Sequence, residues 1–176
     1  AVIYNTQNFF TANSFDASQI ILDVDGYPMP MLISEKVNKI EIDGANRKWF
    51  ATDNAGIFTF SPNGDKEIYH FTDKNSPLLS NKVISLTIDP ITGEVFAATD
   101  LGLVSYRSNA IEPFTEMQEI KIFPNPVPAD INGYITMDGL PEDSYVTITD
   151  SYGKVVYKTK SLGGRATWNG VDVYNN

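Results

Sequence analysis

The sequence predicts an all-β fold in which about two β-propeller blades, forming a partial propeller, precede a small antiparallel immunoglobulin-like β-sandwich. Three observations predict it. One stretch of the chain repeats itself at an offset of 46 residues, short apolar runs are separated by turn residues along the chain, and no window shows the sustained three- and four-residue apolar spacing of a helix. Helix is therefore expected to be scarce.

Length and composition are those of an ordinary globular protein. The 176 residues suffice for one mid-sized domain or two small ones, and 42% hydrophobic against 20% charged residues allow a core to form. A formal net charge of -9 without a basic cluster argues against a nucleic-acid partner, because nucleic acids are held by clustered Lys and Arg. No run approaches the roughly 20 apolar residues needed to span a bilayer, so no membrane span is expected.

The chain has no cysteine, which excludes disulfides, thiolate metal sites and a cysteine nucleophile. The first 20 residues lack the charged-then-apolar order of a signal peptide. Because the chain starts in mid-pattern, any leader is expected to lie outside this sequence.

The internal repeat is the most informative feature of the sequence. Without a gap it superimposes Val37 on Val83, Ile40 on Leu86, Ile42 on Ile88, Asp43 on Asp89, Phe50 on Phe96, Ala51 on Ala97, Gly56 on Gly102, Ile57 on Leu103, Phe58 on Val104 and Phe60 on Tyr106. Each copy has an alternating strand, a polar turn, a short apolar strand, a glycine and a third alternating strand. Units of about 40 to 50 residues with several short strands are typical of propeller blades.

Two of the repeated positions have residue types that suit turns. Asp43 and Asp89 stand just before a turn, where a carboxylate accepts hydrogen bonds from backbone amides in an Asx-type turn. Gly56 and Gly102 suit a tight hairpin with positive φ, a conformation that only glycine enters without steric cost. A metal ion at the two aspartates is the less favoured alternative.

The middle strand of each copy is expected to be covered on both faces, which suits small residues such as Ala51 and Ala97. Trp49 lies in this strand, and its counterpart in the ungapped alignment is Val95. We therefore expect Trp49 in the core between the blades rather than on a sugar-binding surface.

The pattern divides the chain into three parts. Residues 1–112 are predicted to form the partial propeller, with the end of one blade followed by blades at about 34–80 and 81–110. Residues 113–119 are interpreted as a linker. Residues 120–176 are assigned to a sandwich module that is incomplete at its C-terminal end, where a strand or two would still be needed.

Residues 1–33 fit the repeat poorly and are interpreted as the tail of a preceding blade, with an irregular loop that contains Pro28 and Pro30. The run Asp23–Gly26 has the alternate carboxylates with which a calcium loop begins. The remaining ligands of such a loop are missing from the sequence, so a plain β-turn is favoured.

Five short strands separated by turn signals predict the sandwich. Pro124, Asn125 and Pro126 are expected to fix the start of its first strand, because a residue before proline is held in extended backbone. Gly153 completes a turn in the run DSYG. Trp168, in the run ATWNG, is expected to pack in the core, with an exposed sugar-binding ring as the alternative.

The residues also resemble a known family. The runs DGANRKWFATDNAGIFTFSPNG, NSPLLSNKV and TGEVFAATDLGLVSYRSNA resemble two-component-regulator-type propeller repeats of Bacteroidetes. The runs FPNPV and GYITMDGLPEDSYVTITDSYGKVVYKTKSLGGRATWNG resemble the C-terminal sorting module associated with the type IX secretion system. A propeller followed directly by this module is similar to PorZ-like surface proteins, over about residues 35–174.

The resemblance implies a fold with two seven-bladed propellers and the terminal module. It implies a cell-surface, outer-membrane-associated or periplasmic location, and recognition of type IX secretion components or of anionic lipopolysaccharide or another cell-surface glycan. The sequence departs from the family at its end, because the Gly-Val-Tyr strand that follows the WNG turn in the family is absent.

Catalytic chemistry finds little support in the sequence. His70 is the only histidine, and it lies in the run EIYHFTD, where a solvent-facing or sheet-packed ring is favoured over a general base. No paired carboxylates or activated serine accompany it. The sequence therefore predicts no enzyme, no metal and no cofactor.

The leading hypothesis is a non-catalytic binding and scaffold protein at the bacterial surface. The alternative is the periplasmic sensor propeller of a hybrid two-component histidine kinase, which uses the same repeats. A third possibility is a secreted propeller enzyme that acts on glycans and carries the tail as a delivery module. If these residues stand alone, their open blade edges predict self-association.

Overall fold

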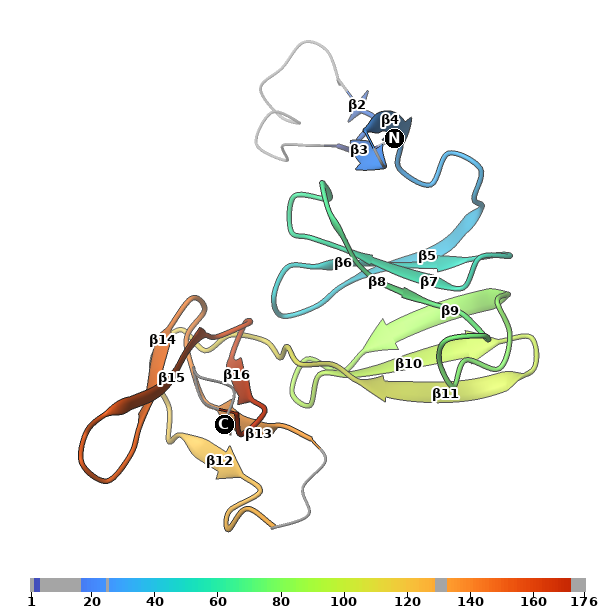
Figure 1. Ribbon diagram of the computed structural model, residues 1–176. Coiled ribbons are helices and arrows are strands. Elements are labelled where there is room, and N and C mark those ends of the chain that lie inside the picture. The colour runs from blue at the N-terminus through green and yellow to red at the C-terminus, as the bar shows by residue number, and fades with distance from the viewer. Residues whose placement is uncertain (1, 4–16, 25, 129–132, 172–176) are drawn as a thin grey trace.

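The computed structural model describes residues 2–3, 17–24, 26–128 and 133–171, and all regular structure among them is β-strand. The first blade consists of β5 (Val37–Ile42), β6 (Lys48–Thr52), β7 (Ile57–Phe60) and β8 (Glu67–Phe71), in that order in one antiparallel sheet. The second blade consists of β9 (Val83–Ile88), β10 (Glu94–Thr99) and β11 (Gly102–Arg107). The sandwich lies beside the second blade (Figure 1). The predicted all-β fold is confirmed.

The sandwich is built from two small antiparallel sheets. One contains β12 (Lys121–Phe123), β13 (Ile135–Asp138) and β16 (Arg165–Trp168), and the other contains β14 (Tyr145–Thr149) and β15 (Val155–Lys160). Its core is formed by Met137, Leu140 and Ala166, against which the ring of Trp168 packs.

The N-terminal part forms two short antiparallel pairs. These are β1 (Val2–Ile3) with β2 (Ala17–Ser18), and β3 (Ile21–Val24) with β4 (Tyr27–Pro30). The prediction of an irregular loop at Pro28 and Pro30 is wrong, because both prolines lie in β4. Met31 donates its N–H to Ile20 at 2.9 Å, so by alternation the backbone nitrogens of residues 28 and 30 face away from β3. The prolines are tolerated there because no hydrogen bond to β3 is lost at these positions.

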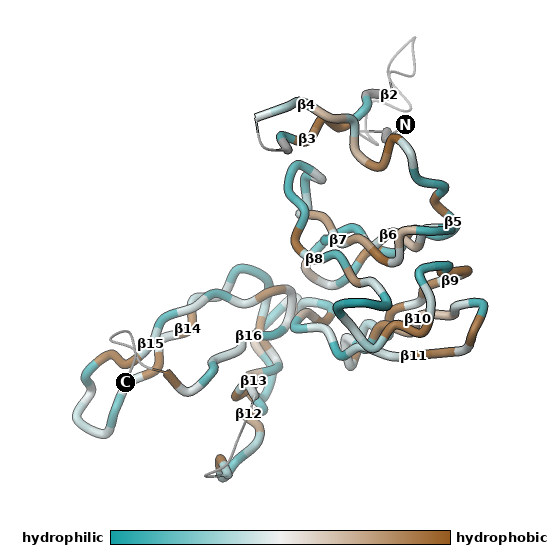
Figure 2. The backbone as a smooth tube through the Cα atoms, turned by 45° about the vertical axis from the view of Figure 1, so that its right-hand side comes forward, coloured by the Kyte–Doolittle hydropathy of each residue, from teal (hydrophilic) through white to brown (hydrophobic). Residues whose placement is uncertain are grey.

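The apolar core of the two blades lies between their facing sides. It contains Trp49, Ala51 and Ile57 from the first blade, Leu78 from the connecting loop, and Val83, Leu86, Val95 and Ala97 from the second. The largely apolar course of β10 is visible in Figure 2. Asn38 adds a polar tie, because its Nδ2 donates to the Val83 carbonyl oxygen at 2.9 Å.

The strand register corrects the ungapped alignment in the middle strand. Lys48 pairs with Ile42 and Phe60, whereas Val95 pairs with the repeat counterparts Ile88 and Tyr106. Val95 is therefore the structural counterpart of Lys48, and Trp49 corresponds to Phe96 rather than to Val95. The cause is one extra residue in the first turn of the second copy (89–94 against 43–47) and one fewer in its second turn (99–102 against 52–56).

The shift reverses which face each side chain occupies. Trp49 faces the second blade and Val95 faces the first, so both enter the same core from opposite sides. The threonines that end the middle strands confirm the corrected match, since Thr52 Oγ1 donates to the Gly56 carbonyl at 2.8 Å and Thr99 Oγ1 to the Gly102 carbonyl at 2.9 Å. A one-residue slip in a strand always exchanges its faces.

Candidate functional site

The first feature of the site is a buried carboxylate at the first turn of the first blade. Asp43 Oδ1 accepts the N–H groups of Ala45 and Arg47, each at 3.0 Å. Asp43 Oδ2 accepts Arg47 Nε–H at 2.7 Å and Trp49 Nε1–H at 2.9 Å. The carboxylate thus holds the turn, the tryptophan and the arginine together.

Arg47 carries this arrangement to the end of the second blade. Its side chain is 4% exposed, and its two terminal nitrogens donate to Asn109 Oδ1 at 2.9 Å and to Ser108 Oγ at 2.8 Å. A buried guanidinium is tolerated when its charge is paired and its nitrogens find acceptors, and Asp43, Ser108 and Asn109 supply one acceptor for each of the three nitrogens. Arg47 also lies over the ring of Tyr69, 5.9 Å from its centroid.

A second arginine reaches the same place from the sandwich. Arg165 forms a two-pronged ion pair with Asp138, with Nε–Oδ1 at 2.7 Å and Nη2–Oδ2 at 2.8 Å. Its remaining terminal nitrogen donates to the carbonyl oxygens of Ser108 at 3.1 Å and Thr92 at 3.2 Å. Ser108 therefore accepts from the first blade through its hydroxyl and from the sandwich through its carbonyl.

Three glycines bring the backbones of this junction together. A Cβ added to Gly44, Gly163 or Gly164 would run into the backbone of Ile111 or Glu112. Gly164 donates its N–H to the Ile111 carbonyl at 3.0 Å.

Residues 113–119, interpreted as a linker, lie along the sandwich and form backbone hydrogen bonds with it. Phe114 donates its N–H to the Leu140 carbonyl at 3.2 Å, and Gln118 donates to Gly139 at 3.0 Å.

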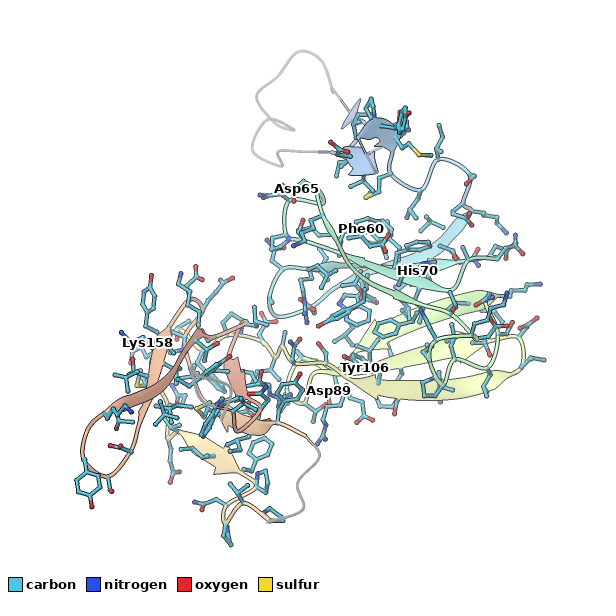
Figure 3. The ribbon with its side chains drawn as sticks, in the orientation of Figure 1. Phe60, Asp65, His70, Asp89, Tyr106 and Lys158 are labelled. Atoms are coloured by element: carbon cyan, nitrogen blue, oxygen red, sulfur yellow. The ribbon has the colours of Figure 1, made fainter. Side chains whose placement is uncertain are left out.

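A cleft of about 530 Å³ opens where the blades meet the sandwich, and we name it the junction cleft. It is lined by Tyr69, Tyr106, Arg107, Ser108, Asn109, Phe123, Tyr134, Thr136, Arg165 and Thr167. Tyr106 is labelled in Figure 3, on the side of the second blade that is next to the sandwich. Burial raises the pKa of Tyr106, and the neighbouring Tyr69 adds to this.

A smaller cavity of about 220 Å³ lies between the two blades. Its mostly apolar lining includes Trp49, Phe71, Leu78, Val104 and Tyr106. Tyr106 packs there against Phe71, with ring centroids 5.0 Å apart. Tyr106 therefore borders both the cavity between the blades and the junction cleft.

The other predicted turn residues lie in turns away from the cleft. Asp89 Oδ1 accepts the N–H of Ile91 at 2.8 Å, as an Asx-type turn requires. Gly56, Gly102 and Gly153 all have positive φ, at 79°, 144° and 81°. In the run 23–26, Asp23 Oδ1 accepts the Gly26 N–H at 2.7 Å.

No cluster of three or more potential metal-ligating side chains occurs in the described ranges. The same ranges contain no helix that is long and apolar enough to cross a membrane.

The predicted residues of the sandwich are also placed apart from the cleft. Pro124, Asn125 and Pro126 follow β12 instead of preceding it, so they end the first strand rather than fix its start. Trp168 is half-buried and stacks on Tyr157 at 6.1 Å. Its Nε1–H donates to the Val171 carbonyl at 2.7 Å.

Of the predicted residues, only Asp43 and Trp49 are brought together at the junction. Sequence reasoning missed Arg47, Ser108 and Arg165. A weak signal for Arg47 was its place four residues after a turn aspartate, but its partner Ser108 lies 61 residues further along the chain.

Comparison with known proteins gives an informative structural likeness. The chain is similar to PorZ, an essential bacterial surface component of the type IX secretion system of Porphyromonas gingivalis, with a TM-score of 0.62 and 28% identity. The likeness covers 99% of this chain and 24% of PorZ, so the chain spans about a quarter of that protein. No protein-family model and no curated protein matches the chain.

A second solved structure is less similar. It is the extracellular domain of a putative one component system from B. thetaiotaomicron, with a TM-score of 0.39, 16% identity, and coverage of 73% of this chain and 16% of that one. At the level of structure, PorZ supports the resemblance found in the sequence.

Proposed function

We propose that the protein is a non-catalytic, extracytoplasmic binding and scaffold protein that works with a type IX secretion system. The observation that carries the proposal is the likeness to PorZ over both blades and the sandwich, at 28% identity across 99% of the chain. The compared region includes the junction, where Arg47 ties the first blade to the end of the second and Arg165 ties the sandwich to the second blade. A rigid arrangement of this kind suits presentation of a binding face.

The proposed partners are secretion components or an anionic lipopolysaccharide or related glycan of the cell surface. What supports a binding role is a concave site with a few convergent polar groups among aromatic side chains, which is the usual character of ligand sites. The packing and hydrogen bonding of His70 support the non-catalytic part of the proposal. Its ring stacks on Phe58 at 3.9 Å, and its Nε2 lies 2.7 Å from the Ala55 carbonyl oxygen.

The proposal is tested by capture. The tagged protein is incubated with outer-membrane extract of its host, cross-linked, and recovered alongside an unrelated propeller protein of similar charge. Mass spectrometry and lipopolysaccharide staining are expected to show type IX secretion components or anionic lipopolysaccharide enriched on the protein. Recovery of neither would overturn the proposal.

A further inference from the structure

We propose that the junction cleft binds an acidic oligosaccharide, with sugar rings packed on Tyr106, Phe123 and Tyr134 and an acidic group held by Arg107. The inference rests on the proposed function and deepens it by assigning the place and the chemistry of glycan recognition. Four features of the cleft carry it.

The first feature is the face that the sandwich presents. In the sheet β12–β13–β16, Phe123 pairs with Thr136, and Thr136 pairs with Thr167, so the three form one cross-strand row. Neighbouring positions such as Met137 point to the opposite face, into the core. The row that contains Arg165 is docked on the second blade. The row of Phe123, Thr136 and Thr167 is thus left to border the cleft.

The second feature is the exposure of the aromatic rings. Tyr134 is 63% exposed, Tyr106 41% and Phe123 39%. Single exposed apolar residues are normal on a protein surface, but these three border one cleft and come from two different units. A tyrosine or phenylalanine ring offers a flat apolar face, and the tyrosines add a polar hydroxyl. Such rings match the apolar C–H faces of sugar rings.

The third feature is the charge of the cleft. Arg47 and Arg165 also lie at the junction, but Asp43 and Asp138 neutralise them. Arg107 has no ion pair or side-chain hydrogen bond within the part of the chain that the structure describes. Glu94 lies opposite Arg107 in the β10–β11 register, but its carboxylate accepts from Ser105 Oγ at 2.7 Å and forms no ion pair with Arg107 in the described residues. In a protein of net charge -9, this guanidinium is therefore an unpaired positive group at the cleft. A guanidinium fits the two oxygens of a carboxylate or phosphate group.

The fourth feature is a set of unused polar groups. The hydroxyls of Thr136 and Thr167 form no hydrogen bond within the described ranges. Asn109 uses its Oδ1 to accept from Arg47, which leaves its amide N–H groups as donors. Hydroxyls and amide donors between aromatic rings suit a ligand that carries many hydroxyl groups.

The test uses two probes that differ only in charge. Oligogalacturonate carries a carboxylate on every ring, and its methyl ester has the same rings without the charge. Affinities of the full chain for both are measured by titration calorimetry, with chemical-shift mapping to locate the site. We expect the acidic oligomer to bind more tightly, with shifts at Tyr106, Tyr134 and Arg107.

Variants separate stacking from charge recognition. Tyr134→Ala should lower the affinity for both oligomers about tenfold, because both lose the ring platform. Arg107→Ala should lower only the affinity for the acidic oligomer, also about tenfold, because only that probe offers a partner for the guanidinium. Tyr152→Ala is the matched control, since Tyr152 is 95% exposed at a hairpin outside the cleft, and it should change neither affinity.

The outcomes distinguish the inference from the proposed function. Absence of binding to either oligomer, or equal effects of Tyr134→Ala and Tyr152→Ala with unchanged melting temperatures, would overturn the cleft as the site. If the cleft variants still capture anionic lipopolysaccharide from host membranes, the location is wrong and the proposed function stands. If wild type binds the oligomers through the cleft but captures nothing from the host, the cleft assignment stands and the proposed function fails.

Discussion

Asp43 shows how one side chain can organise a junction. Its two oxygens accept four hydrogen bonds, and the arginine among the donors reaches the second blade. The repeat counterpart Asp89 accepts hydrogen bonds from Ile91 and Thr92, both in its own turn, so the same residue type at the same repeat position holds a turn but does not join two units. What separates them is Arg47.

We expect Asp43→Asn to reduce the free energy of unfolding by about 3–5 kcal/mol, because it leaves the Arg47 charge buried without its partner. Urea denaturation followed by tryptophan fluorescence measures this loss. Asp89→Asn is the matched control and should cost far less, since no ion pair is broken within the described residues. Equal losses for the two variants would contradict the role assigned to Asp43.

Asp89 predicts a pH dependence of its own. The N–H of Ile91, followed by contacts from Thr92, holds the pKa of Asp89 below its ordinary value. A lowered folded pKa stabilises the protein above the unfolded pKa, about 3.9, and this contribution disappears as the pH falls through the folded value. The difference in unfolding free energy between wild type and Asp89→Asn should therefore be constant from about pH 5 to 7 and shrink below about pH 4. A difference that does not change with pH would refute this.

The strands were largely predictable from the sequence, and their turns less so. Alternation and turn residues are local signals, so the strands at 37–42, 57–60 and 155–160 follow directly from them. The register of β10 was mispredicted because a residue gained in one turn and lost in the next leaves an ungapped alignment intact on both sides. The candidate site was hardly predictable, since its ties join residues 57 to 73 positions apart and chain pattern carries no such information.

The glycine turn before β16 gives a test of the close backbone approach. Gly163 has φ 59°, and a Cβ there would meet the carbonyl oxygens of Ile111 and Gly44. Gly153 has φ 81° and open space around it. Gly153→Ala should cost about 1 kcal/mol through backbone strain alone, and Gly163→Ala clearly more. Differential scanning calorimetry compares them, and equal shifts in Tm would show that the contact is unimportant.

The blades and the sandwich are held as one body by contacts that converge on residues 108–112. Buried ion pairs, close glycines and backbone bonds all meet there. Interfaces between domains of one chain are ordinarily small and polar, and they permit relative motion unless something restrains it. Here Arg165 is the restraint supplied by the sandwich.

We expect Arg165→Met to cost about 3 kcal/mol and to uncouple the sandwich from the blades, because Asp138 loses its partner and Ser108 loses the donor from the sandwich. Calorimetry should then show two unfolding transitions where wild type shows one, and hydrogen exchange should rise at the junction. Lys158→Met, on an exposed position of β15, is the control and should leave a single transition. A single transition for Arg165→Met would show that Arg165 does not couple the sandwich to the blades.

In the second copy the first turn is one residue longer, and the second turn one residue shorter, than in the first copy. This difference bears on how the two copies diverged. The first and third strands of the two copies stay at an offset of 46 residues, so the length of chain between them is unchanged. The middle strand itself is turned over, so Trp49 and Phe96 occupy equivalent backbone positions while their neighbours differ. A chimaera that grafts the middle strand of the first copy into the second should keep its core only when it is spliced at an offset of 46 residues, which puts Trp49 and Ala51 in the places of Val95 and Ala97. Splicing at the backbone offset of 47 would put Lys48 in the place of the buried Val95.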